Sequence, residues 1–132
     1  LERSVTDPFD LKDAVTVAEL DLALLEGIAD LLPAFVALPQ FPAVPRDMNF
    51  LLDETTTWSQ LEAAVLEAKA DNLACVSFGG QYRGKQIPAD KKSYIVTADF
   101  RAPDRTLTSE EIDAAQAAIV TACETQLGAT LR

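Results

Sequence analysis

The stretch YRGKQIPADKKSYIVTADFR, residues 82–101, decides the fold because it joins a basic loop to a strand with one buried face. Its second half alternates between two sets of side chains, Tyr94, Val96, Ala98 and Phe100 on one side and Ser93, Ile95, Thr97 and Asp99 on the other. This period of two is typical of a β-strand that packs one face against a core. We therefore expect a strand over residues 93–101, with its second face and the preceding loop available for function.

The same stretch is positively charged within an acidic chain. It holds two anions and five cations, Arg83, Lys85, Lys91, Lys92 and Arg101, whereas the whole chain has a formal net charge of −10. That overall charge argues against indiscriminate nucleic-acid binding, which depends on neutralising phosphates. The loop at residues 83–92 is a candidate for local phosphate contacts. A solvated hairpin connection is the simpler alternative.

The segments upstream of this stretch supply two more strands and a helix. Residues 46–53, RDMNFLLD, alternate as a first strand. Thr57 and Gln60 form a capping box for a helix that should end near Asp71 and Asn72. A second apolar run from Leu73 to Phe78 follows, and we expect it to bend or bulge at Gly79 and Gly80.

The downstream segments complete the pattern. Thr108 and Glu111 form a second capping box, Gly128 ends the long helix that it opens, and residues 129–132 form a short last strand. The order β-α-β-β-α-β predicts an α+β, ferredoxin-like sandwich, in which both helices cover one face of a four-stranded antiparallel sheet. The other face is then open, and it carries Asp47, Asn49, Leu51, Ile95, Thr97 and Asp99.

The open face indicates which residues are candidates for binding. It is neither basic nor aromatic, which disfavours binding of RNA across the sheet as in RRM domains. Tyr82 is the best candidate for an exposed aromatic, whereas Trp58 is expected to cover the edge of the core. Arg46 and Asp47 are either a catalytic or ligand-binding pair or, as we favour, a structural ion pair that fixes the connector.

Residues 1–40 are expected to be an N-terminal extension to the domain at residues 41–132. Ala14 to Leu22 read as a short strand that passes into a helix limited by Gly27. Four prolines, Pro33, Pro39, Pro42 and Pro45, then favour an extended connector. The chain begins without methionine, which suggests a piece of a longer polypeptide.

Composition excludes several classes of function. Histidine is absent, which removes Ser-His-Asp and Cys-His catalytic arrangements and the usual zinc sites. No apolar run is long enough to span a membrane, and no signal peptide opens the chain. Cys75 and Cys123 lie in apolar contexts, so we expect both to be buried and reduced in a cytoplasmic protein, with a disulfide or a reactive thiol as the alternative.

Three stretches together resemble the ferredoxin-fold anticodon-binding domain at the C-terminus of the bacterial phenylalanyl-tRNA synthetase beta chain. They are FPAVPRD at residues 41–47, the run from YRG through Ile87-Pro88 to KKS at residues 82–93, and the run from FR through Pro103 to RTLT with Glu111. The terminal Leu131-Arg132 also fits. Residues 14–39 resemble the tail of the catalytic-like module that precedes this domain.

The resemblance implies a non-catalytic domain that contacts the anticodon region of tRNA(Phe). The parent would be a cytoplasmic α2β2 ligase that uses ATP and magnesium, with its chemistry on the alpha chain. This fragment would hold no cofactor or metal and would be monomeric. Tyr82 would stack on a base, and the backbone phosphates would be contacted by Arg46, Arg83, Lys85, Lys91, Lys92 and Arg101.

Two other functions are compatible with the predicted fold. A small-ligand regulatory or dimerisation module would bind amino acids at paired sheet edges. An acylphosphatase-like enzyme would need a glycine-rich phosphate loop between the first strand and the first helix. Residues 53–57, DETTT, are acidic and contain no glycine, which disfavours the enzyme.

Overall fold

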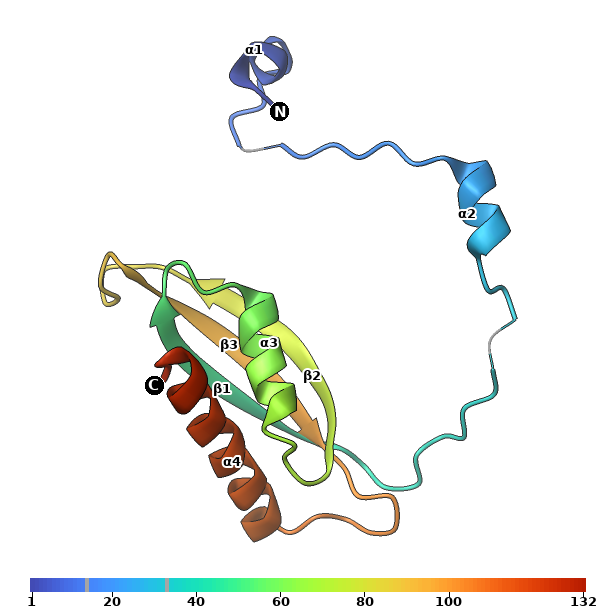
Figure 1. The fold of residues 1–132 in the computed structure, drawn as a ribbon, viewed down its shortest axis with the longest axis vertical. Coiled ribbons are helices and arrows are strands. Elements are labelled where there is room, and N and C mark those ends of the chain that lie inside the picture. The colour runs from blue at the N-terminus through green and yellow to red at the C-terminus, as the bar shows by residue number, and fades with distance from the viewer. Residues whose placement is uncertain (14, 33) are drawn as a thin grey trace. The chain divides into compact units, whose positions relative to one another are not determined.

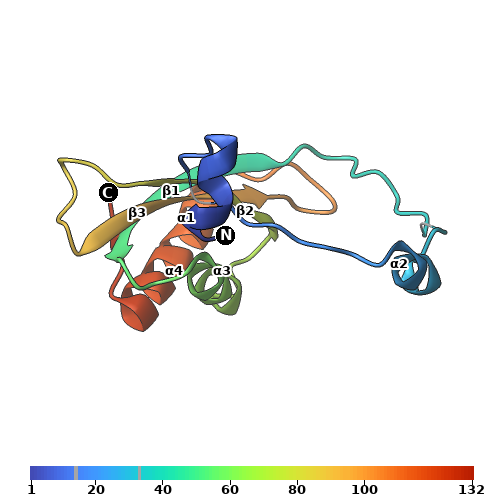
Figure 2. The same ribbon diagram turned by 90° about the horizontal axis from the view of Figure 1, so that it is seen from above.

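Residues 38–132 form a four-stranded sheet in the order β2-β3-β1-β4, in which all neighbours are antiparallel (Figure 1). This computed structural model describes residues 1–13, 15–32 and 34–132. Its strands are β1 (Val44–Asp53), β2 (Leu73–Tyr82), β3 (Lys91–Phe100) and β4 (Thr130–Leu131). Two helices, α3 (Trp58–Glu67) and α4 (Ser109–Leu127), lie on the same side of the sheet (Figure 2). The predicted α+β, ferredoxin-like fold is confirmed.

The covered face of the sheet holds the core. The buried side chains of α3 and α4 pack against the inward side chains of β1 and β3. The helices contribute Leu61, Ala64, Val65, Ile112, Ala115, Ile119 and Cys123, and the strands contribute Met48, Phe50, Leu52, Tyr94, Val96, Ala98 and Phe100. These are the inward positions that the period of two predicts for β1 and β3. Trp58 packs against the core edge, with its ring 6.1 Å from Tyr94 and 5.2 Å from Phe78, centroid to centroid. The prediction for Trp58 is confirmed.

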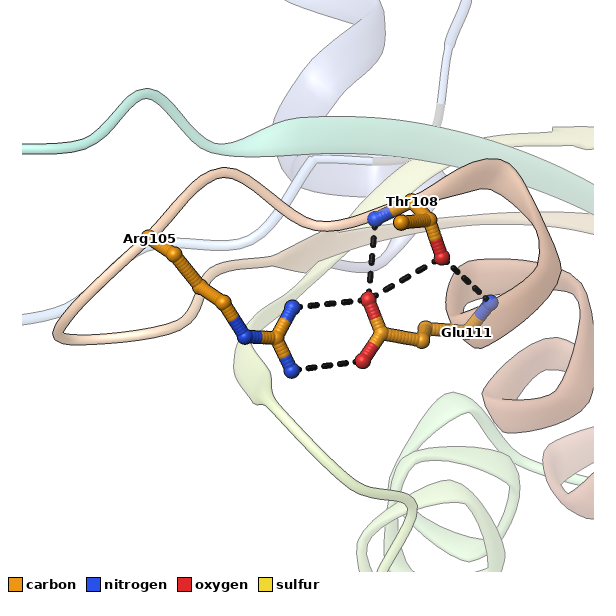
Figure 3. A network of polar contacts seen from close by, with 3 residues as sticks. All are labelled: Arg105, Thr108 and Glu111. Carbon is orange, nitrogen blue, oxygen red and sulfur yellow. Dashed lines mark hydrogen bonds and ion pairs between the residues drawn. The ribbon is translucent and has the colours of Figure 1, made fainter.

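Both helices of the sheet unit begin with reciprocal caps. Gln60 N donates to Thr57 Oγ1 at 3.4 Å, and Thr57 N donates to Gln60 Oε1 at 2.8 Å. Thr108 and Glu111 repeat the arrangement at α4, and Arg105 adds a two-pronged contact to the same carboxylate (Figure 3). The capping boxes therefore fix the starts of both helices.

The helix ends follow from backbone geometry. α4 stops at Gly128, whose φ of 59° is left-handed, as predicted. α3 ends at Glu67, before the expected Asp71–Asn72. Lys69 and Asn72 have φ values of 47° and 59°, which a right-handed helix cannot continue through. The expected helix was therefore too long by one turn.

The glycines in β2 bring irregular pairing. The register with β3 shifts between Leu73 and Cys75 and again between Phe78 and Gly80. Gly80 has a φ of 151°, and a β-carbon on Gly79 would lie 2.7 Å from Ile95 Cγ2. The bulge expected at these glycines is confirmed.

β1 begins two residues earlier than expected and includes Pro45, which was expected to lie in an irregular connector. Asn49 O accepts from Arg132 N at 2.9 Å, so Asn49 presents its backbone groups toward β4. Period two places the Pro45 nitrogen on that same outward edge. Its missing N–H therefore costs no bond to β3.

Residues 1–37 form a separate unit, with α1 (Arg3–Thr6), the 3-10 helix η1 (Asp7–Phe9) and α2 (Leu22–Ile28). Asp21 caps α2, accepting from Ala23 N at 2.9 Å, and the helix passes one residue beyond Gly27. The strand expected at residues 14–22 is wrong for its described part, because residues 15–20 are not in a strand. Ala14 and Pro33 lie outside the described residues.

The two cysteines differ in environment, and both are free. Cys123 is buried in the core, and this burial raises the pKa of its thiol to about 11. Cys75 is exposed, which corrects the expectation of burial. It pairs with Asp99 across β2 and β3, so it lies on the open face. No described helix is long and apolar enough to cross a membrane.

Candidate nucleic-acid interface

The open face of the sheet carries mostly polar side chains from three strands, together with Leu51, Ile95 and Tyr82. Among residues 38–132, all of them described, α3 and α4 leave this face uncovered (Figure 2). Asn49, Leu51, Ile95, Thr97 and Asp99 are half-buried, and Asp47 is exposed. Pairing with β3 adds Cys75, Ser77 and Tyr82 from β2 to the same face.

Cross-strand hydrogen bonds order this polar face. Thr97 Oγ1 donates to Asp47 Oδ1 at 2.6 Å, and Ser93 Oγ donates to Asn49 Oδ1. Ser77 Oγ donates to the carbonyl oxygen of Thr97 at 3.4 Å. The amide nitrogen of Asn49 and the second carboxylate oxygen of Asp47 keep capacity for a further ligand. The face therefore presents preorganised groups able to read a base edge.

Tyr82 lies at one end of this face, opposite Ser93. Its side chain is 53% exposed, as expected for an aromatic available to a ligand. A β-carbon built on Gly84 would overlap the phenol oxygen of Tyr82. The ring therefore lies against the backbone of Gly84, with surface left free for stacking.

The positive charge of the neighbouring loop is neutralised by the end of β1. Arg83 Nε donates to Glu54 Oε1 at 2.8 Å and to Oε2 at 3.0 Å, and Lys91 pairs with Asp53. The hydrogen bond to Arg83 lowers the pKa of Glu54, and the bond to Asp53 raises the pKa of Lys91. In three dimensions this region is thus far less basic than the sequence of residues 82–101 indicates.

Lys92 is buried, whereas a side chain that binds phosphate was expected to be exposed. It is 6% exposed and lies on the covered face, opposite Leu52, with Nζ 5.0 Å from the centroid of the Tyr94 ring. This geometry is typical of a cation–π contact. Period two explains the burial, since Lys92 continues the inward series that contains Tyr94.

Lys85 is exposed in the connection between β2 and β3. Ile87, 7% exposed, anchors that connection, and Gln86 Oε1 accepts from Arg132 Nη2 at 3.4 Å. Lys85 therefore lies near Tyr82 in sequence, on a connection that the burial of Ile87 fixes to the domain.

Arg46 and Arg101 lie at the other end of the sheet. Arg46 pairs with Ala98 and lies seven positions before Asp53, which is about 23 Å along a strand. Its Nη2 lies 3.9 Å from Asp113 Oδ1 of α4. The favoured Arg46–Asp47 ion pair is therefore wrong, because adjacent strand residues point to opposite faces. Arg101 is half-buried, and its backbone N donates to Asn72 O at 2.8 Å.

The structure thus groups Tyr82, Arg83, Lys85 and Lys91 at one end and separates them from Arg46 and Arg101. Sequence reasoning missed Glu54 and Asp53 as members of the first group. The antiparallel order was the available signal, because it brings the end of β1 beside the start of β3.

Other possible sites lie away from Tyr82. A groove of about 370 Å³ runs along α4 and is lined by Asp113, Gln116, Ala117, Val120, Thr121 and Leu131. Within residues 1–13, 15–32 and 34–132, no group of three His, Cys, Asp or Glu side chains could hold a metal ion.

Comparison with known proteins agrees with this fold. Residues 39–132 match the family model described as the ferredoxin-fold anticodon binding domain. Over 97% of its length, the chain is 37% identical to the phenylalanine–tRNA ligase beta subunit of Clostridium tetani and 32% identical to that of Clostridium acetobutylicum. Over its full length it is 34% identical to that of Geobacillus kaustophilus. The chain spans 16% of the length of each of these relatives. It belongs to the family of ferredoxin-fold anticodon binding domains.

Proposed function

We propose that residues 38–132 bind the anticodon region of tRNA(Phe) as a non-catalytic domain of a phenylalanine–tRNA ligase beta subunit. The observation that carries this proposal is the family match over residues 39–132. Relatives that carry the ligase name align with nearly the whole chain, which supports the parent protein. The exposed ring of Tyr82 beside a hydrogen-bonding sheet face supports the use of that face for RNA.

In the proposed complex, Tyr82 stacks on an unpaired base, and the open face contacts base edges. Lys85 contacts a neighbouring phosphate. Arg46 and Arg101, at the far end of the sheet, contact a second part of the RNA backbone. Lys92 is left out of this interface because its side chain is buried.

The rest of the ligase supplies the chemistry. The parent is a cytoplasmic α2β2 enzyme in which ATP, magnesium and the reacting amino acid bind outside this chain, on parts that include the alpha chain. We assign no residue of this chain to them. The family match favours this function over an amino-acid-binding regulatory or dimerisation module.

Steady-state kinetics of the intact ligase test the proposal. Tyr82→Ala is expected to raise the KM for tRNA(Phe) about tenfold, since one base–aromatic stack contributes about 1–3 kcal/mol. Amino-acid activation in the absence of tRNA should stay unchanged. Tyr82→Phe is the matched control, because it keeps the ring and should keep the KM. An unchanged KM in Tyr82→Ala would contradict the assigned interface.

A binding titration tests base recognition directly. Labelled tRNA(Phe) and a tRNA altered only in its anticodon are titrated with the ligase, with and without Tyr82→Ala. We expect the altered tRNA to bind more weakly and Tyr82→Ala to reduce the difference. Equal affinity of the wild-type ligase for both tRNAs would overturn anticodon recognition.

A further inference from the structure

The Arg83–Glu54 pair ties together two strands that are not neighbours in the sheet. Glu54 follows the end of β1 and Arg83 follows the end of β2, while β3 lies between these strands. Arg83 Nε reaches both carboxylate oxygens of Glu54, and Nη2 also contacts Oε1. This forked contact fixes direction as well as distance, which a lysine in place of Arg83 would not do.

The ion pair with Glu54 fixes the position of Arg83, the residue after Tyr82. Tyr82 itself contacts Gly84. The phenol lies against the Gly84 backbone. The amide of Gln81, oriented with its oxygen toward Arg83, accepts from Arg83 Nη2 at 2.8 Å. These contacts fix the backbone on both sides of Tyr82, through Arg83 and Gln81 and through the close approach of Gly84 to the ring.

We propose that Glu54, acting through Arg83, is a positioning residue for Tyr82, and that Arg83 does not itself contact an RNA phosphate. The inference rests on the proposed function of the open face. A ring already oriented before binding loses less conformational freedom when a base stacks on it. Glu54 thereby contributes to RNA affinity although it is an anion beside a polyanionic ligand.

The alternative role for Arg83 is a direct phosphate contact, and the charges around it disfavour that role. Glu54 occupies Nε and one N–H of Nη2, and Gln81 faces Nη1 and Nη2, so few of the five N–H donors of Arg83 are left for a phosphate. A neutralised pair also releases few counterions on meeting RNA. The hydrogen bond from Arg83 lowers the pKa of Glu54, which favours the ionised carboxylate that the pair requires.

The two roles predict different salt dependence. Labelled tRNA(Phe) is titrated at several salt concentrations with the intact ligase carrying Glu54→Gln or Arg83→Gln. Positioning predicts that each variant weakens binding about three- to tenfold without changing the slope of log affinity against log salt. A phosphate contact predicts that Arg83→Gln reduces the slope by about one and that Glu54→Gln strengthens binding. The second pattern would overturn the proposal.

A charge swap gives a second test. The double variant Glu54→Arg, Arg83→Glu reverses the pair while keeping one forked contact. It is expected to recover at least half of the lost affinity, measured as log Kd. If Arg83 bound a phosphate, the double variant would not recover tRNA affinity, because it carries a glutamate at position 83. Thermal unfolding of each variant identifies any that fails to fold.

Two controls separate this inference from the proposed function. In a Tyr82→Ala background, Glu54→Gln should cause no further loss of affinity, whereas an additional loss would contradict positioning. The matched control is Glu111→Gln, which breaks a second forked Arg–Glu pair, that of Arg105, at the start of α4 (Figure 3). It should leave tRNA affinity unchanged.

If Tyr82→Ala binds tRNA as tightly as the wild type does, both the proposed interface and the positioning role are contradicted. If Tyr82→Ala weakens tRNA binding and Glu54→Gln does not, the interface stands and only the positioning role of Glu54 is contradicted.

Discussion

The phenol of Tyr82 lies so close to Gly84 that no β-carbon fits on residue 84 without moving the ring. The two residues flank Arg83, which Glu54 holds from the end of β1. The orientation of the exposed aromatic therefore depends on the absence of a side chain two residues further on. Glycine at this position is explained by the close approach of a neighbouring side chain.

Gly84→Ala is accordingly expected to displace Tyr82 and to raise the KM of the intact ligase for tRNA(Phe) several-fold. Tyr82 is half-exposed, so thermal unfolding should change little. Gly27→Ala is the control, because a β-carbon there meets nothing within 4 Å. A normal KM in Gly84→Ala would show that the ring orientation seen here is unimportant for binding.

Glu111 makes the folding stability of the domain depend on pH. The bond from Arg105, with bonds from Thr108, lowers the pKa of Glu111 to about 2 in the folded state. A carboxyl whose pKa is depressed by folding stabilises the fold above its unfolded pKa, which is about 4.3. That stabilisation is lost as the pH falls from there through about 2, the folded value.

Glu111→Gln tests this dependence, since Gln60 shows that glutamine completes the same capping box in α3. The variant should melt at a lower temperature than the wild type at pH 7, and the difference should shrink below about pH 4 and vanish as the pH falls through about 2. Melting curves followed by circular dichroism across this range measure the effect. A constant difference at all pH values would contradict a contribution from the charge.

The strand faces and helix caps could be predicted because they depend on local patterns. The alternation at Tyr94, Val96, Ala98 and Phe100 identified the core side, and the Thr-x-x-Gln and Thr-x-x-Glu boxes located both helix starts. Such signals need only residues that are close in sequence.

The charge of the loop could not be predicted in this way. Residues 82–101 are basic when counted along the chain, yet Asp53 meets Lys91 through the β1–β3 register, and Glu54, the next residue, meets Arg83 beyond the end of β2. Lys92 gave a similar error, since only period two, and not its charge, indicated burial. Cys75 was misplaced because its apolar context belongs to an edge strand with one uncovered face.

Lys92 is expected to contribute to stability and not to RNA binding. Lys92→Glu places an anion at a site that is 6% exposed and removes the cation from the Tyr94 ring. We expect a loss of roughly 1–3 kcal/mol in the free energy of unfolding. Chemical denaturation measures this loss.

Lys85→Glu is the comparison for Lys92→Glu, because Lys85 is exposed. It should weaken tRNA binding in the intact ligase and leave unfolding nearly unchanged. If Lys92→Glu is as stable as the wild type, the buried position of Lys92 is contradicted.

Stability is expected to reside in residues 38–132, because, in the part of the chain that the structure describes, the hydrophobic core cluster lies there. Phe50→Ala removes a fully buried ring and should lower the free energy of unfolding by about 3–5 kcal/mol. Phe35→Ala is the matched control, since that ring is 91% exposed and its removal should change almost nothing. Deleting residues 1–37 should likewise leave the melting temperature of the sheet unit unchanged. A large drop after this deletion would show that the first unit packs on the second, and the boundary near residue 38 would then not separate independent folding units.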